Sequence, residues 1–173
     1  MELKSIFGLP AHPLIVHGAV VLLPLAAILV VVVALLPKAR RIGAPIALGL
    51  AIVATVAVFL AEQSGESLEH QVKETSAVEA HTHAADAVLP WSVLVTLAAA
   101  AAVAADPLQR RLGKPSPKVA GAVLVVLALA SATGATITVI DVGHSGAKAT
   151  WGDTFKNAPK NGDGERDHDS DGG

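Results

Sequence analysis

Four apolar runs, each close to twenty residues long, constrain this chain more than any other feature. They extend over 14–36, 44–61, 87–105 and 119–140, and none of them contains an Asp, Glu, Lys or Arg. A helix needs about 20 residues to cross the roughly 30 Å of hydrocarbon in a bilayer. A buried helix of a soluble protein would break such a run with polar residues. The runs therefore predict an all-α membrane protein, a bundle of four transmembrane helices.

The charges in the three connecting loops predict the orientation of the bundle. The first and third loops hold seven basic residues, which are Lys38, Arg40, Arg41, Arg110, Arg111, Lys114 and Lys118. The second loop, over 62–86, holds only Lys73 against six Asp or Glu residues. Short basic loops stay on the cytoplasmic side of a membrane. We therefore expect a multi-pass protein with short cytoplasmic loops and with both termini and the acidic loop outside.

Part of the acidic outer loop is predicted to be helical. Ser76 and Glu79 have the spacing of a capping box, in which each side chain bonds the other's backbone amide. A helix that starts there would continue through Asp86 into the third span. At about 100° per residue, one face of that helix carries His81, Ala85, Val88 and Ser92.

The fourth span and the end of the chain differ sharply in composition. One stripe of the span carries Ser131, Gly134, Thr138 and Asp141, with His144 just past its end. Small and weakly polar residues on one stripe indicate a helix–helix contact in lipid. Residues 153–173 are polar, rich in Gly and Asp, and without apolar anchors. We therefore expect a membrane domain over 1–152 and a disordered polar tail over 153–173.

The histidines are the residues most suggestive of chemistry. All seven fall in the half that is predicted to lie outside, namely His12, His17, His70, His81, His83, His144 and His168. The pattern HPxxxH opens the first span, and Pro13 suits the first turn of a helix. His12 then lies at the cap and His17 about one turn inside the apolar run. An ionisable residue inside a membrane is a candidate for function.

Two more histidines lie at the outer ends of other spans. His81 precedes the third span and His144 follows the fourth, so three of the four helices carry such a residue. The remaining outer end carries Glu62, Glu66 and Glu69. Helix ends converge in a bundle, so we expect one layer with side chains pointing inward, formed by His12, His17, His81 and His144. His70 and His83 should be more exposed.

Several motifs resemble a bacterial membrane family known as domain of unknown function 2231. They are "GLPAHPLIVHGAVVLLPLA", "QSGESLE", "EAHTHAAD" and "GHSGAKATWG", and the resemblance covers about residues 6–152. It implies a four-helix domain of the bacterial inner membrane without an established activity, sometimes attached to c-type cytochromes. The family's histidines fall on His12, His17, His81 and His144, its acids on Glu66, Glu69 and Glu79, and its small turn residues on Gly65, Gly143 and Gly146. Many members have an aromatic residue where this chain has Gly18.

The first class of function is a b-type haem protein that passes electrons to a partner at the outer face. Bis-imidazole ligation across helices is a common way to hold haem iron. His17 with His81 or His144 is the natural pair, and His12 would join them or orient a ligand. The carboxylates expected around these cofactor-binding histidines are Glu66, Glu69, Glu79 and Asp141.

The second class is a site for a transition-metal ion, in which His12, His17, His81 and His144 would be the ligands of copper, zinc or iron. The chain has no cysteine and a single methionine. Cu(I) prefers soft sulfur ligands, so this composition leaves the harder divalent ions.

The third class is a structural or accessory subunit whose histidines only bond helix ends and carboxylates. No nucleophile–base pair or phosphate loop appears, which argues against an enzyme. No basic stripe with interleaved aromatic residues appears, which argues against nucleic acid as a partner. The lipid bilayer is the expected surrounding, and the sequence is compatible with a homo-oligomer.

Overall fold

The computed structural model describes residues 5–6, 9–69, 75–112 and 117–156. The short strands β1 (Ser5–Ile6) and β2 (Leu9–Pro10) pair antiparallel at the start. Five helices follow, α1 (Ala11–Leu35), α2 (Pro37–Glu69), α3 (Ser76–Ala85), α4 (Val88–Leu112) and α5 (Pro117–Lys156). The predicted all-α architecture is confirmed.

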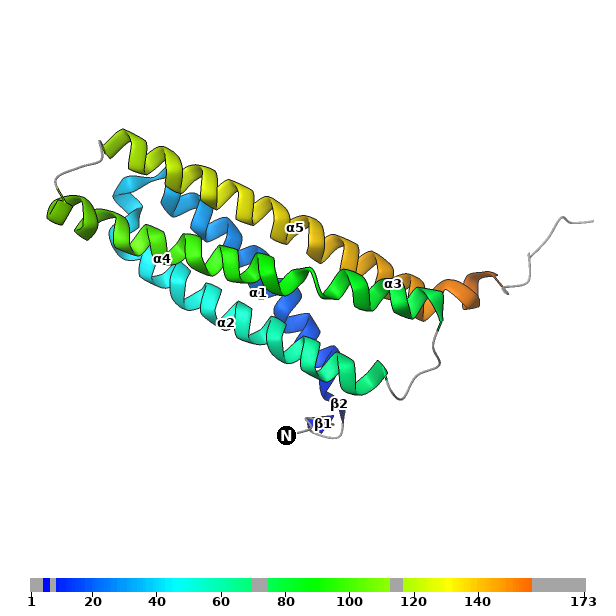
Figure 1. Cartoon of the computed structure of the whole chain (residues 1–173). Coiled ribbons are helices and arrows are strands. Elements are labelled where there is room, and N and C mark those ends of the chain that lie inside the picture. Colours follow the sequence, from blue (N-terminus) through cyan, green and yellow to red (C-terminus); the bar gives the residue numbers. More distant parts are fainter. Residues whose placement is uncertain (1–4, 7–8, 70–74, 113–116, 157–173) are drawn as a thin grey trace, which may run out of the picture.

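The four long helices form a bundle in which α1 and α4 lie diagonally opposite (Figure 1). Helix α1 packs on α2 and α5, and α4 packs on the same two helices. Four segments are long and apolar enough to cross a membrane, and they are 12–35, 37–66, 76–105 and 118–151. The prediction of four membrane-spanning helices is therefore confirmed, with each helix longer than its apolar run.

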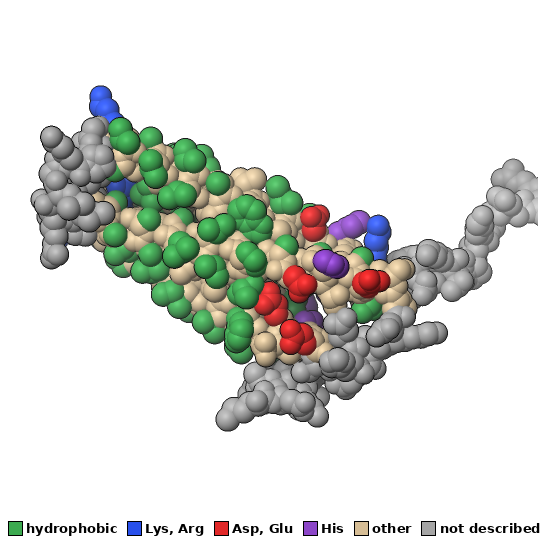
Figure 2. All heavy atoms as spheres, viewed as in Figure 1, with side chains coloured by type: hydrophobic (Ala, Val, Ile, Leu, Met, Phe, Trp, Pro, Cys, Tyr) green, Lys and Arg blue, Asp and Glu red, His purple; other side chains and the backbone are tan. Residues whose placement is uncertain are grey.

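The surface of the bundle is divided by chemistry along its length. Large hydrophobic side chains cover the middle of the face in Figure 2, and many of them are exposed, such as Val21, Ile28 and Val126. Asp, Glu and His side chains gather at the end where α2 leads to α3. We call this the histidine end, defined by His12 and His81. An apolar girdle of this kind suits lipid as the surrounding medium.

The core of the bundle is built from small residues. The buried stripe of α2 has heptad spacing and consists of Ala44, Ala47, Ala51, Ala54 and Val58. Small residues let helix backbones approach closely, which is how helices pack without a hydrophobic driving force in lipid. The same stripe continues to Ala61 and Gly65, which line the cavity described below. The core packing of α2 therefore leads directly into the candidate site.

Helices α3 and α4 are nearly continuous, as predicted, but they are separated at Asp86 and Ala87. Pro90 explains the interruption, because its ring removes an N–H and crowds the carbonyl four residues earlier, that of Asp86. The helix also begins one residue away from the predicted cap. Thr75 is the cap, and its Oγ1 accepts from the amide of Val78 at 3.2 Å. The prediction of Ser76 as the cap was wrong.

The fourth span extends further than expected. Helix α5 continues to Lys156, so His144 lies within it rather than past its end. Gly65, Gly143 and Gly146 are helical, and none of them forms a turn. Helix α5 also includes the first four residues of the expected tail, and the remainder, over 157–173, lies outside the described residues.

Candidate functional site

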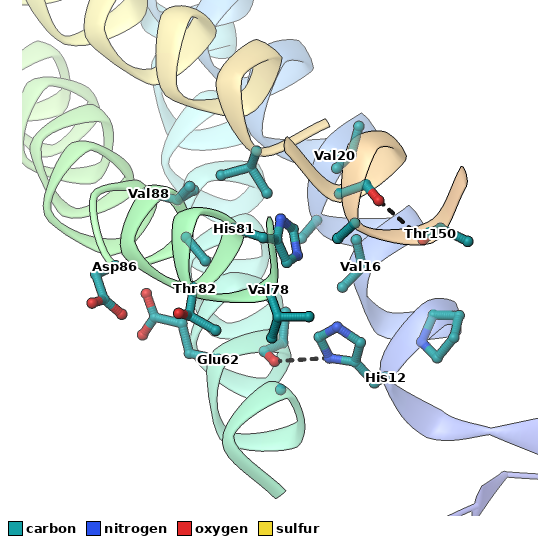
Figure 3. Close-up of a pocket in the computed structure, with 18 of the residues that line it drawn as sticks. His12, Val16, Val20, Glu62, Val78, His81, Thr82, Asp86, Val88 and Thr150 are labelled. Carbon is teal, nitrogen blue, oxygen red and sulfur yellow. Dashed lines mark hydrogen bonds between the residues drawn. The ribbon is translucent and has the colours of Figure 1, made fainter. Parts of the chain in front are cut away.

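A cavity of about 1180 Å³ opens at the histidine end between two pairs of helices. Its walls come from α1 and α2 on one side and from α3 and α5 on the other, with Val88 of α4 at its floor (Figure 3). Helix α3 packs mainly on α5 and has few contacts with α2. Two imidazoles line this cavity, that of His12 from α1 and that of His81 from α3.

The imidazole of His12 is held by α2. Its Nδ1 lies 3.1 Å from the carbonyl oxygen of Ala61 and 2.9 Å from the Oγ of Ser64. The Ser64 hydroxyl itself donates to the Ala61 carbonyl at 2.9 Å. The ring lies on the backbone of Gly65, where a Cβ would be 3.1 Å from the imidazole Cε1. A serine and a glycine on α2 thus fix one edge of the ring.

The imidazole of His81 is held by a serine and a glycine of α5, without the direct carbonyl contact that His12 has. Its Nδ1 lies 3.2 Å from the Oγ of Ser145, and that hydroxyl donates to the carbonyl of Val142 at 3.1 Å. A Cβ at Gly146 would be 3.1 Å from the Cε1 of His81. No described residue forms a hydrogen bond with the Nε2 of either His12 or His81.

The rest of the cavity is apolar in its depth and acidic on one side. Valine and alanine side chains dominate the lining, including Val16, Ala19, Val58, Ala85 and Val142. Glu62 of α2 and Asp86 of the α3–α4 turn lie together to one side of the imidazoles in Figure 3. Lys148 is the only Lys or Arg among the described residues that line the cavity.

Glu62 has an unusual environment for a carboxylate. Its carboxylate lies beside that of Asp86, a group of like charge (Figure 3). Its Oε1 atom is buried and has no hydrogen-bond partner among the described residues. Glu62 therefore presents one unsatisfied oxygen at the wall of the cavity.

The structure brings together only two of the four predicted ligands. His17 is exposed on the outside of α1, and its Nδ1 contacts the carbonyl of Pro13 one turn earlier. His144 is also exposed, on α5. The expectation that both side chains point into the bundle was wrong, because helical periodicity turns these positions away from the buried faces of α1 and α5. His83 is exposed as predicted, and His70 lies outside the described residues.

The predicted carboxylates are dispersed as well. Glu66 lines the cavity, whereas Glu79 and Asp141 are exposed and do not line it. The side chain of Glu69 lies outside those that the structure describes. Within the described residues, no three His, Cys, Asp or Glu side chains are close enough together to hold a metal ion. The expected cluster of four histidines does not form.

Two residues that matter most for the imidazoles were absent from the sequence prediction. Ser64 and Ser145 are ordinary helical serines by pattern, and their role depends on contacts between helices. One signal could have found them, since each begins a Ser-Gly pair that follows a histidine-bearing helix. That pair recurs as "SGES" at 64–67 and "SGAK" at 145–148.

Comparison with known proteins gives a family but no activity. No curated protein and no solved structure matches the chain significantly. The model of one family matches residues 8–159, which includes every described helix residue that lines the cavity. The chain therefore belongs to the family described as predicted membrane protein of domain of unknown function 2231.

Proposed function

We propose that this membrane protein binds a b-type haem in the cavity at the histidine end, with His12 and His81 as the two axial ligands. The observation that carries the proposal is the shared state of the two imidazoles. Each has its Nδ1 bonded to the neighbouring helix and its Nε2 without a partner among the described residues. A histidine that binds a metal with one ring nitrogen commonly donates the N–H of its other ring nitrogen to an acceptor in the protein.

The cavity suits a large planar group better than a small solute. Its volume of about 1180 Å³ lies near the upper limit of ordinary ligand sites, which run to roughly 1,000 Å³. Valine and alanine side chains would contact the porphyrin. Lys148 would supply the positive charge that pairs with a haem propionate. Glu62 and Asp86 occupy another part of the wall and would exclude propionates from it.

A bare metal ion is less well supported than haem iron. An ion needs three or four protein ligands, and the described residues provide no such group. Haem iron receives four ligands from the porphyrin and needs only two from the protein. With both axial positions taken by His12 and His81, the centre would have no open position for a substrate, so electron transfer is the activity that fits.

The proposed location is a bacterial plasma membrane, with the histidine end and both termini outside. The support is the charge of the loops, because Lys38, Arg40 and Arg41 follow α1 at the opposite end. Short basic loops remain in the cytoplasm. An electron partner would then dock at the outer face.

The test is an absorbance spectrum of the protein purified from membranes, supplied with haem during expression. We expect a low-spin b-type spectrum that sharpens on reduction, with about one haem per chain. His12→Ala and His81→Ala should each remove it. His17→Ala and His144→Ala are matched controls on α1 and α5, and both should retain it. If haem is absent from the wild type, or if His17→Ala loses it while His12→Ala keeps it, the proposal fails. Metal analysis of the same samples detects a bound ion instead.

A further inference from the structure

The two halves of the chain repeat one pattern. The segment "PKARRIGAP" over 37–45 and the segment "PLQRRLGKP" over 107–115 share Pro, Arg, Arg, Gly and Pro at the same five places. In the sequence, each segment comes after a histidine, His12 or His81, and a long apolar run. Each comes before a Ser-Gly pair, at Ser64 or Ser145. In the structure the first segment begins α2, whereas residues 107–112 of the second end α4. The order of histidine, arginine pair and Ser-Gly is therefore the same in both halves.

The structure gives this repeat a physical meaning. The first hairpin is α1–α2, and the second is α3 and α4 followed by α5. In each hairpin, the histidine of the first arm bonds the serine of the second arm, over the backbone of the following glycine. The two hairpins face each other across the cavity, so their two imidazoles lie on opposite walls. Parallel repeats with a ligand site at their interface are a known plan for membrane proteins.

The hydroxyl groups decide which nitrogen of each ring carries the proton. Ser64 Oγ donates its one hydrogen to the Ala61 carbonyl, three residues earlier, and Ser145 Oγ donates to the Val142 carbonyl, also three residues earlier. Each oxygen therefore has only lone pairs left for the imidazole. With the hydroxyl hydrogen on the carbonyl, the oxygen accepts from the ring, and this geometry favours Nδ1 as the protonated nitrogen of each neutral ring. At His12 the Ala61 carbonyl, 3.1 Å from Nδ1, favours the same tautomer because it can only accept. The Nε2 of each ring is then left with its lone pair.

We propose that the site consists of two similar half-sites, each a histidine with its Ser-Gly pair. Ser145 is the positioning residue that sets the tautomer of His81, and at His12 Ser64 shares this role with the Ala61 carbonyl. The haem as occupant rests on the proposed function, whereas the tautomers and the similarity of the half-sites do not. The ligand class that such a site takes is a metal centre with two like axial positions, one facing each half-site.

The experiment measures the tautomers directly. Protein labelled with ¹⁵N-histidine is purified in detergent. The imidazole nitrogens are then observed by NMR at a pH high enough for both rings to be neutral. Signals of His12 and His81 are assigned by their loss in the two alanine variants. We expect both rings as Nδ1–H tautomers. Ser145→Ala should change the tautomer signals of His81 and leave those of His12. Ser64→Ala should leave His81 unchanged and affect His12 less, because the Ala61 carbonyl still accepts from its Nδ1.

A control on the same helix separates positioning from stability. Ser131 of α5 also donates its hydroxyl to a carbonyl three residues earlier, that of Ala128 at 3.2 Å, and it contacts neither His12 nor His81. Ser131→Ala should leave both tautomers unchanged. Ser145→Thr keeps the hydroxyl and should restore the His81 signals. If Ser145→Ala resembles Ser131→Ala, or if either ring is found as the Nε2–H tautomer in the wild type, the inference is overturned.

Haem affinity provides a second measurement, and it separates a failure of the proposed function from a failure of the half-site inference. Loss of a group that orients a metal-binding histidine typically weakens binding about 10- to 100-fold. Ser145→Ala should weaken haem binding by a factor in this range, and Ser64→Ala by less, because the Ala61 carbonyl still orients His12. A larger loss in Ser64→Ala than in Ser145→Ala would contradict the assignment. Wild-type protein that shows the two tautomers but binds no haem would refute the proposed function and leave the half-sites standing.

Discussion

Gly134 of α5 lies against the face of the Trp91 indole of α4, so closely that a Cβ at position 134 would overlap the ring. The glycine belongs to the stripe of small residues that predicted a helix contact. The contact is real, and its partner is an aromatic side chain. Neither Gly134 nor Trp91 lines the cavity, so this contact belongs to the packing of α4 on α5.

Gly134→Ala should destabilise the bundle, because the added methyl forces Trp91 or the backbone to shift. Overpacking of this kind costs about 1–3 kcal/mol. Thermal unfolding in detergent, followed by far-UV circular dichroism, gives the loss. Gly121→Ala is the control, since nothing lies within 4 Å of a Cβ at that position of α5. Equal stability of the two variants would contradict the contact.

Thr55→Val should weaken the association of α2 with α4 only slightly. The Thr55 hydroxyl donates to the Ser92 carbonyl at 3.1 Å and lies 2.9 Å from the Thr96 hydroxyl. Hydrogen bonds between membrane helices contribute about 0.6 kcal/mol on average. Unfolding by denaturing detergent should show a loss of that order. Thr136→Val is the comparison, because the Thr136 hydroxyl donates within its own helix to Ala132.

Arg40→Ala should be the most damaging change at the end opposite the histidines. The guanidinium is buried, and it donates to the carbonyls of Val33 and Ala34 in the last turn of α1. Carbonyls at a helix end lack partners in their own helix, and burying them unpaired costs about 1–3 kcal/mol each. Expression level and thermal stability measure the loss. Arg41→Ala, at an exposed neighbour, should have little effect.

The orientation can be tested by labelling, because the chain contains no cysteine. Ala39→Cys lies in the first turn of α2, beside Lys38 and Arg40, and Thr75→Cys precedes α3 at the histidine end. In intact cells, we expect an impermeant thiol reagent to label the second variant and to spare the first. In lysed cells both should react. Labelling at position 39 in intact cells would reverse the proposed orientation.

The fold was largely predictable, because four charge-free runs in a short chain leave few arrangements. The face formed by His81, Ala85, Val88 and Ser92 was also predictable, and those residues are buried or line the cavity. Helical periodicity applies to a single helix, and so it located His81 correctly.

The site as a whole was not predictable in this way. His17 was preferred because it lies deeper in an apolar run, but depth along a helix says nothing about the side of the helix on which a residue lies. The position of the His12 imidazole in the cavity depends on Ser64, which is distant in the chain and belongs to another helix. Such a pairing appears only when the helices are packed, unless the repeat of the Ser-Gly pair is noticed first.

The weak contact between α3 and α2 has a mechanical consequence. Packing joins α3 to α5, while α2 is joined to α1, so the cavity is bounded by two units that touch little at its open side. The tight alanine core lies beyond the cavity floor and joins α1, α2, α4 and α5 in the apolar region, with no residue from α3. The bundle is therefore firmly packed in the apolar region and weakly packed where α3 faces α2. The thickness of a bound ligand, rather than the stability of the core, would set the distance between these two helices at the open side of the cavity.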